Sequence, residues 1–402
     1  MRLFAPGALI LLTVFVGTLA GQPALPFRVV DAEYSATLNR IVMIGAVPNQ
    51  LHIYDPVTRV DTTVALPLAP ISLSVAPSGL YAAVGFDALV AHVNLTNGTV
   101  EKLWPVAGVV GEVIAANDYV HIDMGRYQVR SIAIGTGQLS AALPFLEQRL
   151  KGGRLHPTRG RIYVTRDGTS PNDLEYVDVS TGPVAGGGDS NYHGEFQICG
   201  GVLLSADGTK AYNACGSVMT LSTTPALDMR YLNVLPGVYT GRFAEPPVQA
   251  MAESGVTGRL AVMGTWTGAY NPTQILEDNE IRVYDTAMLA PNGRVRLTGF
   301  PVNGNTFAAH GRWLFFDSTG QKLMVVKQAD GASGLLNDFA VETFDLGSAV
   351  PCLSTAAPAS LTVPWTGTSG TIALTASGAA CRQRRRTRAG SRWPITGWWR
   401  VR

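Results

Sequence analysis

The sequence predicts an all-β protein: a β-propeller with seven blades, followed by part of an immunoglobulin-like β-sandwich. Three observations lead to this fold class. Apolar and polar residues alternate in short runs through residues 28–347, and clusters of Gly, Asp, Ser and Pro separate these runs. Almost no segment has a helical period, which disfavours an α/β fold. A different pattern begins at Pro351, where we expect the sandwich to start.

The first element is a repeat of strands and turns. Each copy has an apolar strand, a turn, a second alternating strand and a third strand before another turn. The period is about 46 residues, which is typical of one four-stranded sheet per repeat. A radial arrangement of such sheets buries their apolar faces and leaves only short edges. Six or eight blades remain compatible with this period, whereas a β-helix needs shorter repeats. The seven copies span residues 40–59, 75–98, 119–137, 155–182, 203–222, 259–288 and 317–347.

Two of these copies carry the residues of a known repeat family. The stretches PSGLYAAVG with VNLTNG, and PTRGRIYVT with YVDVSTG, resemble the YVTN-type repeats of exported bacterial propellers. The resemblance covers most of residues 28–347 and mainly reflects one turn and one strand. Propellers of this kind include binding modules, lyases, lactonases and dehydrogenases, so the resemblance implies the fold and not the function.

Residues 1–20 have the pattern of a secretory signal peptide. A positively charged start is followed by an apolar run of about a dozen residues, and we expect cleavage after Ala20. This run is shorter than the roughly 20 apolar residues that a membrane span needs. Residues 21–27 would then lead into the propeller. We therefore expect a secreted or periplasmic protein with no membrane span.

The charge distribution argues against a nucleic-acid partner. The net charge is +2, but residues 381–402 contain eight arginines and no acid. Without these arginines the net charge is −6, so the rest of the chain is mildly acidic. An acidic surface does not attract a polyanion.

Four cysteines suit an exported chain and form two local pairs. Cys199 and Cys215 lie symmetrically about Asp207 in a strand–turn–strand pattern, so we expect them to be cross-strand neighbours that form a disulfide. Cys352 and Cys381 bracket a second short β segment, and we expect a disulfide there as well. Neither pair has the CxxC or CxH spacing of a metal site.

Long loops indicate where a binding site lies. Three insertions, residues 167–175, 266–280 and 328–338, each interrupt the connection between the second and third strands of a blade. The inter-blade linkers 184–196 and 236–247 should reach the same face of the propeller. Loops of this length are often functional.

The candidate binding residues combine aromatic rings with charged groups, which is typical of a sugar- or peptide-binding surface. Each also has a simpler interpretation: Trp266 and Tyr270 could pack the loop onto its neighbour, and Glu277, Asp278 and Glu280 could belong to a solvated charge run. His193 is the best candidate for a general base or metal ligand, although an exposed imidazole is the simpler alternative. The candidates are Tyr192, His193, Glu195, Arg242, Trp266, Tyr270, Glu277, Asp278 and Asp338.

The sequence has no signature of a known catalytic site. It lacks a GxSxG elbow, an HExxH motif, a phosphate-binding glycine loop and EF-hand spacing. We therefore predict no cofactor, no metal and no catalytic residue, and favour a non-enzymatic protein that binds a glycan or a cell-surface protein. The alternative is a propeller lyase or hydrolase. A channel metal or a carboxylate–histidine pair on the loop-bearing face would favour the enzyme, and an exposed aromatic strip would favour binding. No feature indicates an oligomeric state.

Residues 351–381 have the features of a second domain. Cys352, Pro358-Ala359-Ser360, the turn Gly367–Gly370 and Thr375–Gly378 before Cys381 are similar to the first half of a BACON domain. Leu361 and Val363 would alternate in one strand, and Ile372 and Leu374 in another. The resemblance implies a small immunoglobulin-like sandwich that binds carbohydrate or mucin. The second half of such a sandwich is missing here, and half a sandwich cannot cover its own core.

The arginine-rich tail, residues 382–402, has the composition of an out-of-frame translation. Shifting the reading frame near codon 382 permits Thr-Ala-Thr-Ser-Asn-Ala-Ser-Trp, which the BACON family has at this point. We therefore expect a frameshifted and disordered tail, and a non-functional product is a third alternative. The other interpretation is a polybasic arm for anionic lipid. Sequencing the gene again would distinguish these interpretations.

Overall fold

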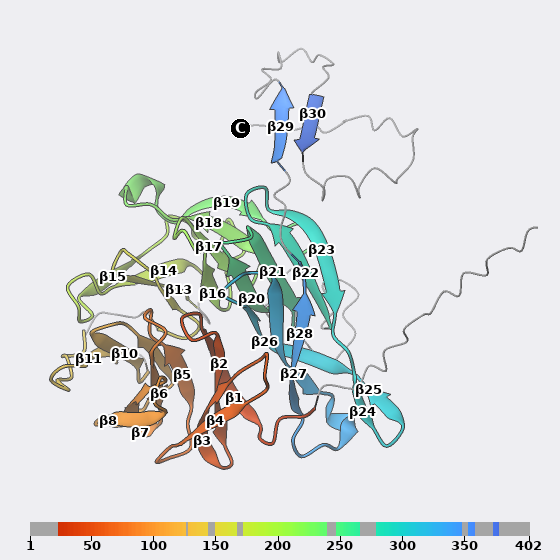
Figure 1. Cartoon of the computed structure of the whole chain (residues 1–402). Helices are drawn as coiled ribbons and strands as arrows, with labels where there is room; N and C mark the ends of the chain where they lie inside the picture. Colours follow the sequence, from red (N-terminus) through yellow and green to blue (C-terminus); the bar gives the residue numbers. More distant parts are fainter. Residues whose placement is uncertain are drawn as a thin grey trace, which may run out of the picture.

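Seven of the antiparallel sheets fan around a common centre (Figure 1). The computed structural model describes residues 23–125, 128–143, 149–166, 172–238, 247–265 and 279–347, together with the backbone of strands 353–357 and 373–377. In each sheet, strands that are consecutive in the chain pair with each other. The first strands of neighbouring sheets lie side by side, as β1 does with β5 and β5 with β9. The fold is therefore a seven-bladed propeller, which confirms the sequence prediction.

Five of the seven blades have four strands within the described residues. Blade 1 contains β1 (Val29–Ser35), β2 (Arg40–Ala46), β3 (Asn49–Tyr54) and β4 (Asp61–Ala65). Blade 2 contains β5 (Ser72–Val75), β6 (Tyr81–Gly85), β7 (Asp87–Asn94) and β8 (Thr99–Val109). Blade 4 contains β12 (Arg154–Leu155), β13 (Arg161–Thr165), β14 (Leu174–Asp178) and β15 (Gly186–Asp189). Blade 5 contains β16 (Val202–Leu204), β17 (Lys210–Asn213), β18 (Ser217–Thr220) and β19 (Arg230–Val234). Blade 6 contains β20 (Val248–Ser254), β21 (Arg259–Gly264), β22 (Glu280–Asp285) and β23 (Ala290–Arg296).

Blades 3 and 7 have three strands each, and a single bridge takes the place of the fourth. Blade 3 contains β9 (Glu112–Ala115), β10 (Tyr119–Asp123) and β11 (Val129–Ala133), and blade 7 contains β26 (Ala309–Phe316), β27 (Lys322–Ala329) and β28 (Phe339–Asp345). Leu139 bridges to Ile132 in blade 3. The hairpin β24 (Phe300–Val302) with β25 (Asn305–Phe307) lies in the linker between blades 6 and 7, and two short 3-10 turns occupy Pro225–Leu227 and Gly331–Ser333.

The amino-terminal segment closes the ring. Ala24 bridges to Ala340 on β28, and the N–H of Leu25 donates to the carbonyl of Phe339 (2.7 Å). This segment, expected only to lead into the propeller, therefore occupies the outer position of blade 7. Pairing the two ends of the chain in one sheet leaves no open seam between the first and last blades.

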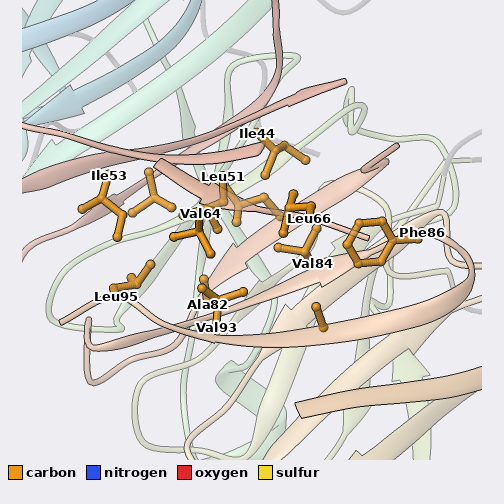
Figure 2. Close-up of a cluster of buried hydrophobic side chains, with 13 residues drawn as sticks. Ile44, Leu51, Ile53, Val64, Leu66, Ala82, Val84, Phe86, Val93 and Leu95 are labelled. Carbon is orange, nitrogen blue, oxygen red and sulfur yellow. The ribbon is translucent and has the colours of Figure 1, made fainter. Parts of the chain in front are cut away.

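The hydrophobic core is divided into layers between neighbouring blades. Figure 2 shows one layer, in which Ile44, Leu51 and Val64 of blade 1 face Val84 and Phe86 of blade 2. Alternation along each strand sends successive side chains to the two neighbouring layers, so both faces of a blade are apolar. Burial of each Val, Leu, Ile or Phe side chain stabilises the fold by about 1.5–3 kcal/mol. The blades are therefore held by packing against each other, and the loops at their ends are left to vary.

The predicted disulfide between Cys199 and Cys215 is present, with the two Cα atoms 5.3 Å apart. The regular ladder of β16 and β17 pairs Val202 with Asn213, which would place Gly200 opposite Cys215. Gly200 has a positive φ of 65°, and the N–H of Ala214 donates to the carbonyls of both Cys199 and Gly201. Gly200 thus bulges out of the pairing and brings Cys199 within reach of Cys215.

Other sequence predictions lie outside the described residues: the signal peptide at 1–20, the pair Cys352 and Cys381, and the tail at 382–402. Strands β29 (Leu353–Ala357) and β30 (Ala373–Ser377) form a two-stranded antiparallel sheet. β30 contains Leu374 of an expected strand, whereas the expected strand at Leu361 and Val363 is outside the described part. Among the described residues, no helix has the length and hydropathy of a membrane span.

Candidate functional site

The loop-bearing face is the end of the propeller where the second strand of each blade ends and the third begins. The connections after β13, β21 and β27 are the long ones. The fourth strand of each blade runs back to this same end, because consecutive strands are antiparallel. The inter-blade linkers therefore start there. The linker from β15 to β16, residues 190–201, carries three of the candidate residues.

The structure describes four of the nine candidates. Tyr192, His193 and Glu195 lie in the linker between blades 4 and 5, and Asp338 directly precedes β28 in blade 7. The other five lie outside the described residues: Arg242, Trp266, Tyr270, Glu277 and Asp278.

Asp338 is engaged in holding blade 7 and the amino-terminal segment together. Its Oδ2 accepts a hydrogen bond from the Gln328 side chain (2.7 Å). Its Oδ1 lies 3.3 Å from Nε of Arg28, and the residue is buried. The carboxylate therefore has a structural role at the ring closure.

His193 lies over a group of acidic side chains that the sequence analysis did not select. Its Nδ1 is 3.5 Å from Oδ2 of Asp173, which precedes β14. Glu175 is two residues further along, on the same side of β14, and Asp189 is its cross-strand neighbour on β15. We call Asp173, Glu175 and Asp189 the blade 4 acid group. Arg166 is the basic residue beside it, with Nη1 3.4 Å from Oε1 of Glu175.

The blade 4 acid group faces blade 3. Val177, which shares a side of β14 with Glu175, packs against Ile114 and Val129 of blade 3. Leu174 points the opposite way and packs against Val202 of blade 5. Asp173 and Glu175 therefore lie on the side of blade 4 that faces blade 3, and their side chains are only 8% and 2% exposed.

Burial raises the pKa of both carboxyl groups. For Glu175 the pKa rises to about 7, because burial and the nearby Asp189 and Asp173 outweigh the opposing charge of Arg166. Burial also raises the pKa of Asp173, and the charge of His193 opposes this shift. Glu195 differs, since hydrogen bonds from backbone N–H groups, including that of His193, lower its pKa at an exposed position. A carboxyl group that titrates near neutral pH can exchange protons with a bound molecule.

His193 is the one exposed histidine of the chain, with 66% of its side chain accessible. The other five histidines are buried in or between the blades and bind neighbouring groups. His121 contacts Ser131 (2.9 Å), and burial lowers the pKa of His121 to about 4. His156 contacts the carbonyl of Gly208 (2.8 Å). These buried imidazoles stabilise the blades, and His310 does so at the loop-bearing end, where its Nε2 lies 3.3 Å from Oδ2 of Asp330 in the connection after β27.

Three half-buried aromatic residues lie on the other side of the same linker. Phe196 stacks on Tyr231 of β19, with ring centroids 3.7 Å apart, and Tyr192 meets Phe196 edge-on at 4.8 Å. The hydroxyl of Tyr192 accepts a hydrogen bond from the N–H of Tyr231 (3.1 Å). We call Tyr192, Phe196 and Tyr231 the linker aromatic group. It is adjacent in sequence to His193, and Tyr192 packs on the same core layer as Leu174.

The inner strands carry a second set of carboxylates. Asp31 accepts hydrogen bonds from the N–H of Leu73 (3.0 Å) and from the indole of Trp313 (3.2 Å), so it joins blades 1, 2 and 7. Glu33 accepts from the N–H of Val75 (2.6 Å), and Glu112 accepts from the N–H of Gly152 (3.1 Å). These N–H groups belong to edge strands or their extensions and need acceptors. The carboxylates therefore join neighbouring blades.

In the described part of the chain, no three His, Cys, Asp or Glu residues are grouped so that they could hold a metal ion. The acid group, Arg166 and His193 can instead bind polar groups and transfer protons. One pattern in the sequence indicates that Glu175 is buried: in LEYVDV it alternates with Val177 and Val179 on the same side of the strand. Asp173, Phe196 and Tyr231 have no comparable signal, because their partners come from other segments.

Comparisons with known proteins show the fold alone. No protein-family model matches the chain, and no curated protein sequence does either. Among solved structures, the chain is similar to hydrazine synthase of Kuenenia stuttgartiensis, with a TM-score of 0.56 and 12% identity over 81% of this chain and 98% of that one. The β-propeller domain of Myceliophteria thermophila Cps50 (Swd1) gives a TM-score of 0.54 and 10% identity over 79% and 97%. U3-55K gives 0.53 and 10% over 76% and 89%.

Proposed function

We propose that the protein binds a glycan on the loop-bearing face, at the linker between blades 4 and 5. The observation that carries this proposal is that His193, whose Nδ1 lies 3.5 Å from Oδ2 of Asp173, directly follows Tyr192 of the linker aromatic group. Aromatic rings offer apolar faces to the C–H groups of a sugar ring, and carboxylates accept hydrogen bonds from its hydroxyls. A glycan needs both kinds of contact.

We also propose that the protein is exported and that its parts belong to known classes. The disulfide Cys199–Cys215 supports export, since disulfides persist in oxidising compartments. The proposed signal peptide would direct the chain there. The propeller would be of the YVTN type, and a BACON-like module at residues 351–381 would add to glycan attachment.

A glycan array with the purified protein tests the proposed function. We expect binding to a defined set of glycans, and we expect Tyr192→Ala to weaken it about tenfold through loss of the stacking surface. Tyr119→Ala is the matched control, because Tyr119 begins β10 at the opposite end of its blade. Absence of glycan binding, together with turnover in a broad hydrolase screen, would contradict the proposal.

A lyase or hydrolase is the second candidate, and one specific observation favours it. A carboxylate–histidine pair on the loop-bearing face would favour an enzyme, and Asp173 with His193 is such a pair. Glu175, with its pKa near 7, could serve as a general acid or base. The 3.5 Å separation is long for a hydrogen bond, and His193 is largely exposed. For this reason binding remains the leading proposal.

A further inference from the structure

Two buried carboxylate oxygens of the blade 4 acid group accept no hydrogen bond from any of the residues that the structure describes. They are Oδ1 of Asp173 and Oε2 of Glu175, on side chains that are more than nine-tenths buried. Buried acceptors are nearly always paired, because an unpaired one has lost its water without replacement. The two oxygens belong to residues on the same side of one strand end, so a single donor group placed there could serve both.

The charges around these oxygens are unbalanced. Asp173, Glu175 and Asp189 supply up to three negative charges, and within the described part of the chain the arginine that contacts a buried member is Arg166, at 3.4 Å. His193 approaches Asp173 from the exposed side at 3.5 Å. Both separations are longer than those of strong charge-assisted hydrogen bonds. The group therefore needs donors that also carry positive charge.

We propose that Asp173 and Glu175 form a subsite for the ammonium group of an unacetylated amino sugar. This inference rests on the proposed glycan binding and names the class of glycan. An ammonium group supplies three N–H donors and a positive charge within one atom's radius, whereas a hydroxyl supplies one donor and no charge. The ring that carries the ammonium would lie toward the linker aromatic group, where Tyr192 is adjacent to His193.

Binding of the ammonium group would displace the imidazole of His193 from Asp173. It is held at Asp173 by one long contact and is otherwise exposed, so it can be displaced at little cost. The bound ammonium then takes the place of the imidazole on Oδ2 of Asp173 and also reaches the free oxygens. Acetylation of the amine removes the charge and two of the three donors, so an N-acetylated sugar would not satisfy the subsite.

Titration calorimetry at neutral pH with a glucosamine tetramer and its fully N-acetylated counterpart tests the subsite. We expect the wild-type protein to prefer the free amine by roughly tenfold, the energy of one charge-assisted hydrogen bond. Asp173→Asn and Glu175→Gln should each abolish that preference, so that the variant binds the two tetramers equally. Asp178→Asn is the matched control, since Asp178 is at the other end of β14 and binds the N–H of Ser180 (2.9 Å).

The remaining outcomes separate this inference from the proposed function. Equal binding of both tetramers by the wild type would overturn the subsite and leave glycan binding standing. No binding of either tetramer, or of any glycan on the array, would overturn both. Binding of a lysine-containing peptide but not of the glucosamine tetramer would overturn the amino sugar in favour of a protein ligand. Both variants replace a carboxylate by an amide of the same shape, and thermal melts of each variant show whether it folds like the wild type.

Discussion

Blades 4 and 6 each bury a glutamate near the loop-bearing end, and the two differ in their donors. Glu175 on β14 and Glu280 on β22 both lie on the side of their sheet that faces the preceding blade. Their side chains are 2% and 3% exposed. Glu175 has one arginine at 3.4 Å and one oxygen that accepts no hydrogen bond. Glu280 has three arginines: Arg282 at 3.0 Å, Arg294 at 3.3 Å and Arg296 at 3.6 Å.

The number of donors, and not burial, sets the charge state of the two side chains. Burial acts to raise both pKa values. At Glu280 the hydrogen bond from Arg282 and the charges of all three arginines outweigh burial, so its pKa is lowered. At Glu175 a single arginine does not, and the pKa rises to about 7. Arg282 also donates to the carbonyl of Gly237 (2.8 Å), so the Glu280–Arg282 pair holds the linker between blades 5 and 6 in place. A satisfied group indicates a structural role, and an unsatisfied one leaves room for a ligand.

The largest expected effect is at Glu280. Glu280→Gln removes the charge that balances three arginines, and we expect it to lower the free energy of unfolding by about 2 kcal/mol at pH 7. This value is below that of a fully buried pair, since Arg294 and Arg296 are 69% and 54% exposed. Because the folded pKa of Glu280 is lowered, the loss should be complete above the unfolded pKa near 4.5 and should fade as the pH drops through the folded value.

Chemical denaturation of the variant and the wild type at several pH values measures this effect. Asp285→Asn is the control, because Asp285 ends the same strand and binds the N–H groups of Ala287 and Met288 in an exposed turn. A stability loss at Glu280 no greater than that of the control would show that the three arginines do not depend on this acid.

The next substitution, Glu175→Gln, should raise the free energy of unfolding instead of lowering it. The pKa of Glu175 rises from 4.5 to about 7 on folding, so ionisation of Glu175 destabilises the fold as the pH rises through this window. A shift of this size corresponds to about 3 kcal/mol. Glu175→Gln removes this penalty but also the Arg166 contact, and we expect a net gain of about 1 kcal/mol at pH 8.

The same denaturation series measures this gain. The difference between Glu175→Gln and the wild type should grow between pH 4.5 and 7, which separates Glu175 from other raised carboxyls such as Glu112 that both proteins share. A variant that is less stable than the wild type at pH 8 would mean that the Glu175 charge is well compensated in the fold. That result would also remove the reason to seek a cationic ligand.

The propeller could be predicted because its information is local. Each of the seven quoted copies contains the second and third strands of one blade, as residues 155–182 contain β13 and β14. Strand alternation and turn residues act over a few positions, so a single repeat reveals them. Ring closure could not be predicted, because Ala24 and Ala340 are at opposite ends of the propeller sequence. The disulfide was predicted by counting about Asp207, although the bulge at Gly200 is what aligns the two cysteines.

The sequence predicted which face of the propeller carries the candidate site, but not which residues form it. The long connections indicated the correct end of the blades, and the linker with Tyr192, His193 and Glu195 was among them. The chemistry depends on residues that meet across blades, such as Tyr231, which is 39 positions from Tyr192. Arg282 follows Glu280 by two residues on β22, but Arg294 and Arg296 come from β23 and Arg166 follows β13, so spacing in the sequence does not give the number of donors. Glu175 and Glu280 look alike in sequence for this reason.

The smallest expected effect tests how much each arginine around Glu280 contributes to the stability of the fold. Arg294→Gln removes an arginine that is 69% exposed and lies 3.3 Å from Oε2 of Glu280. Exposed ion pairs contribute little, so we expect a loss of about 0.5 kcal/mol that disappears in roughly 1 M salt. Arg282→Gln should cost more, because Arg282 is 21% exposed and also binds the carbonyl of Gly237. Denaturation of both variants at low and high salt measures the difference. A loss of stability at Arg294→Gln that equals the loss at Glu280→Gln and resists salt would contradict this expectation. It would mean that Arg294, on the outer strand β23, supplies most of the energy that stabilises buried Glu280.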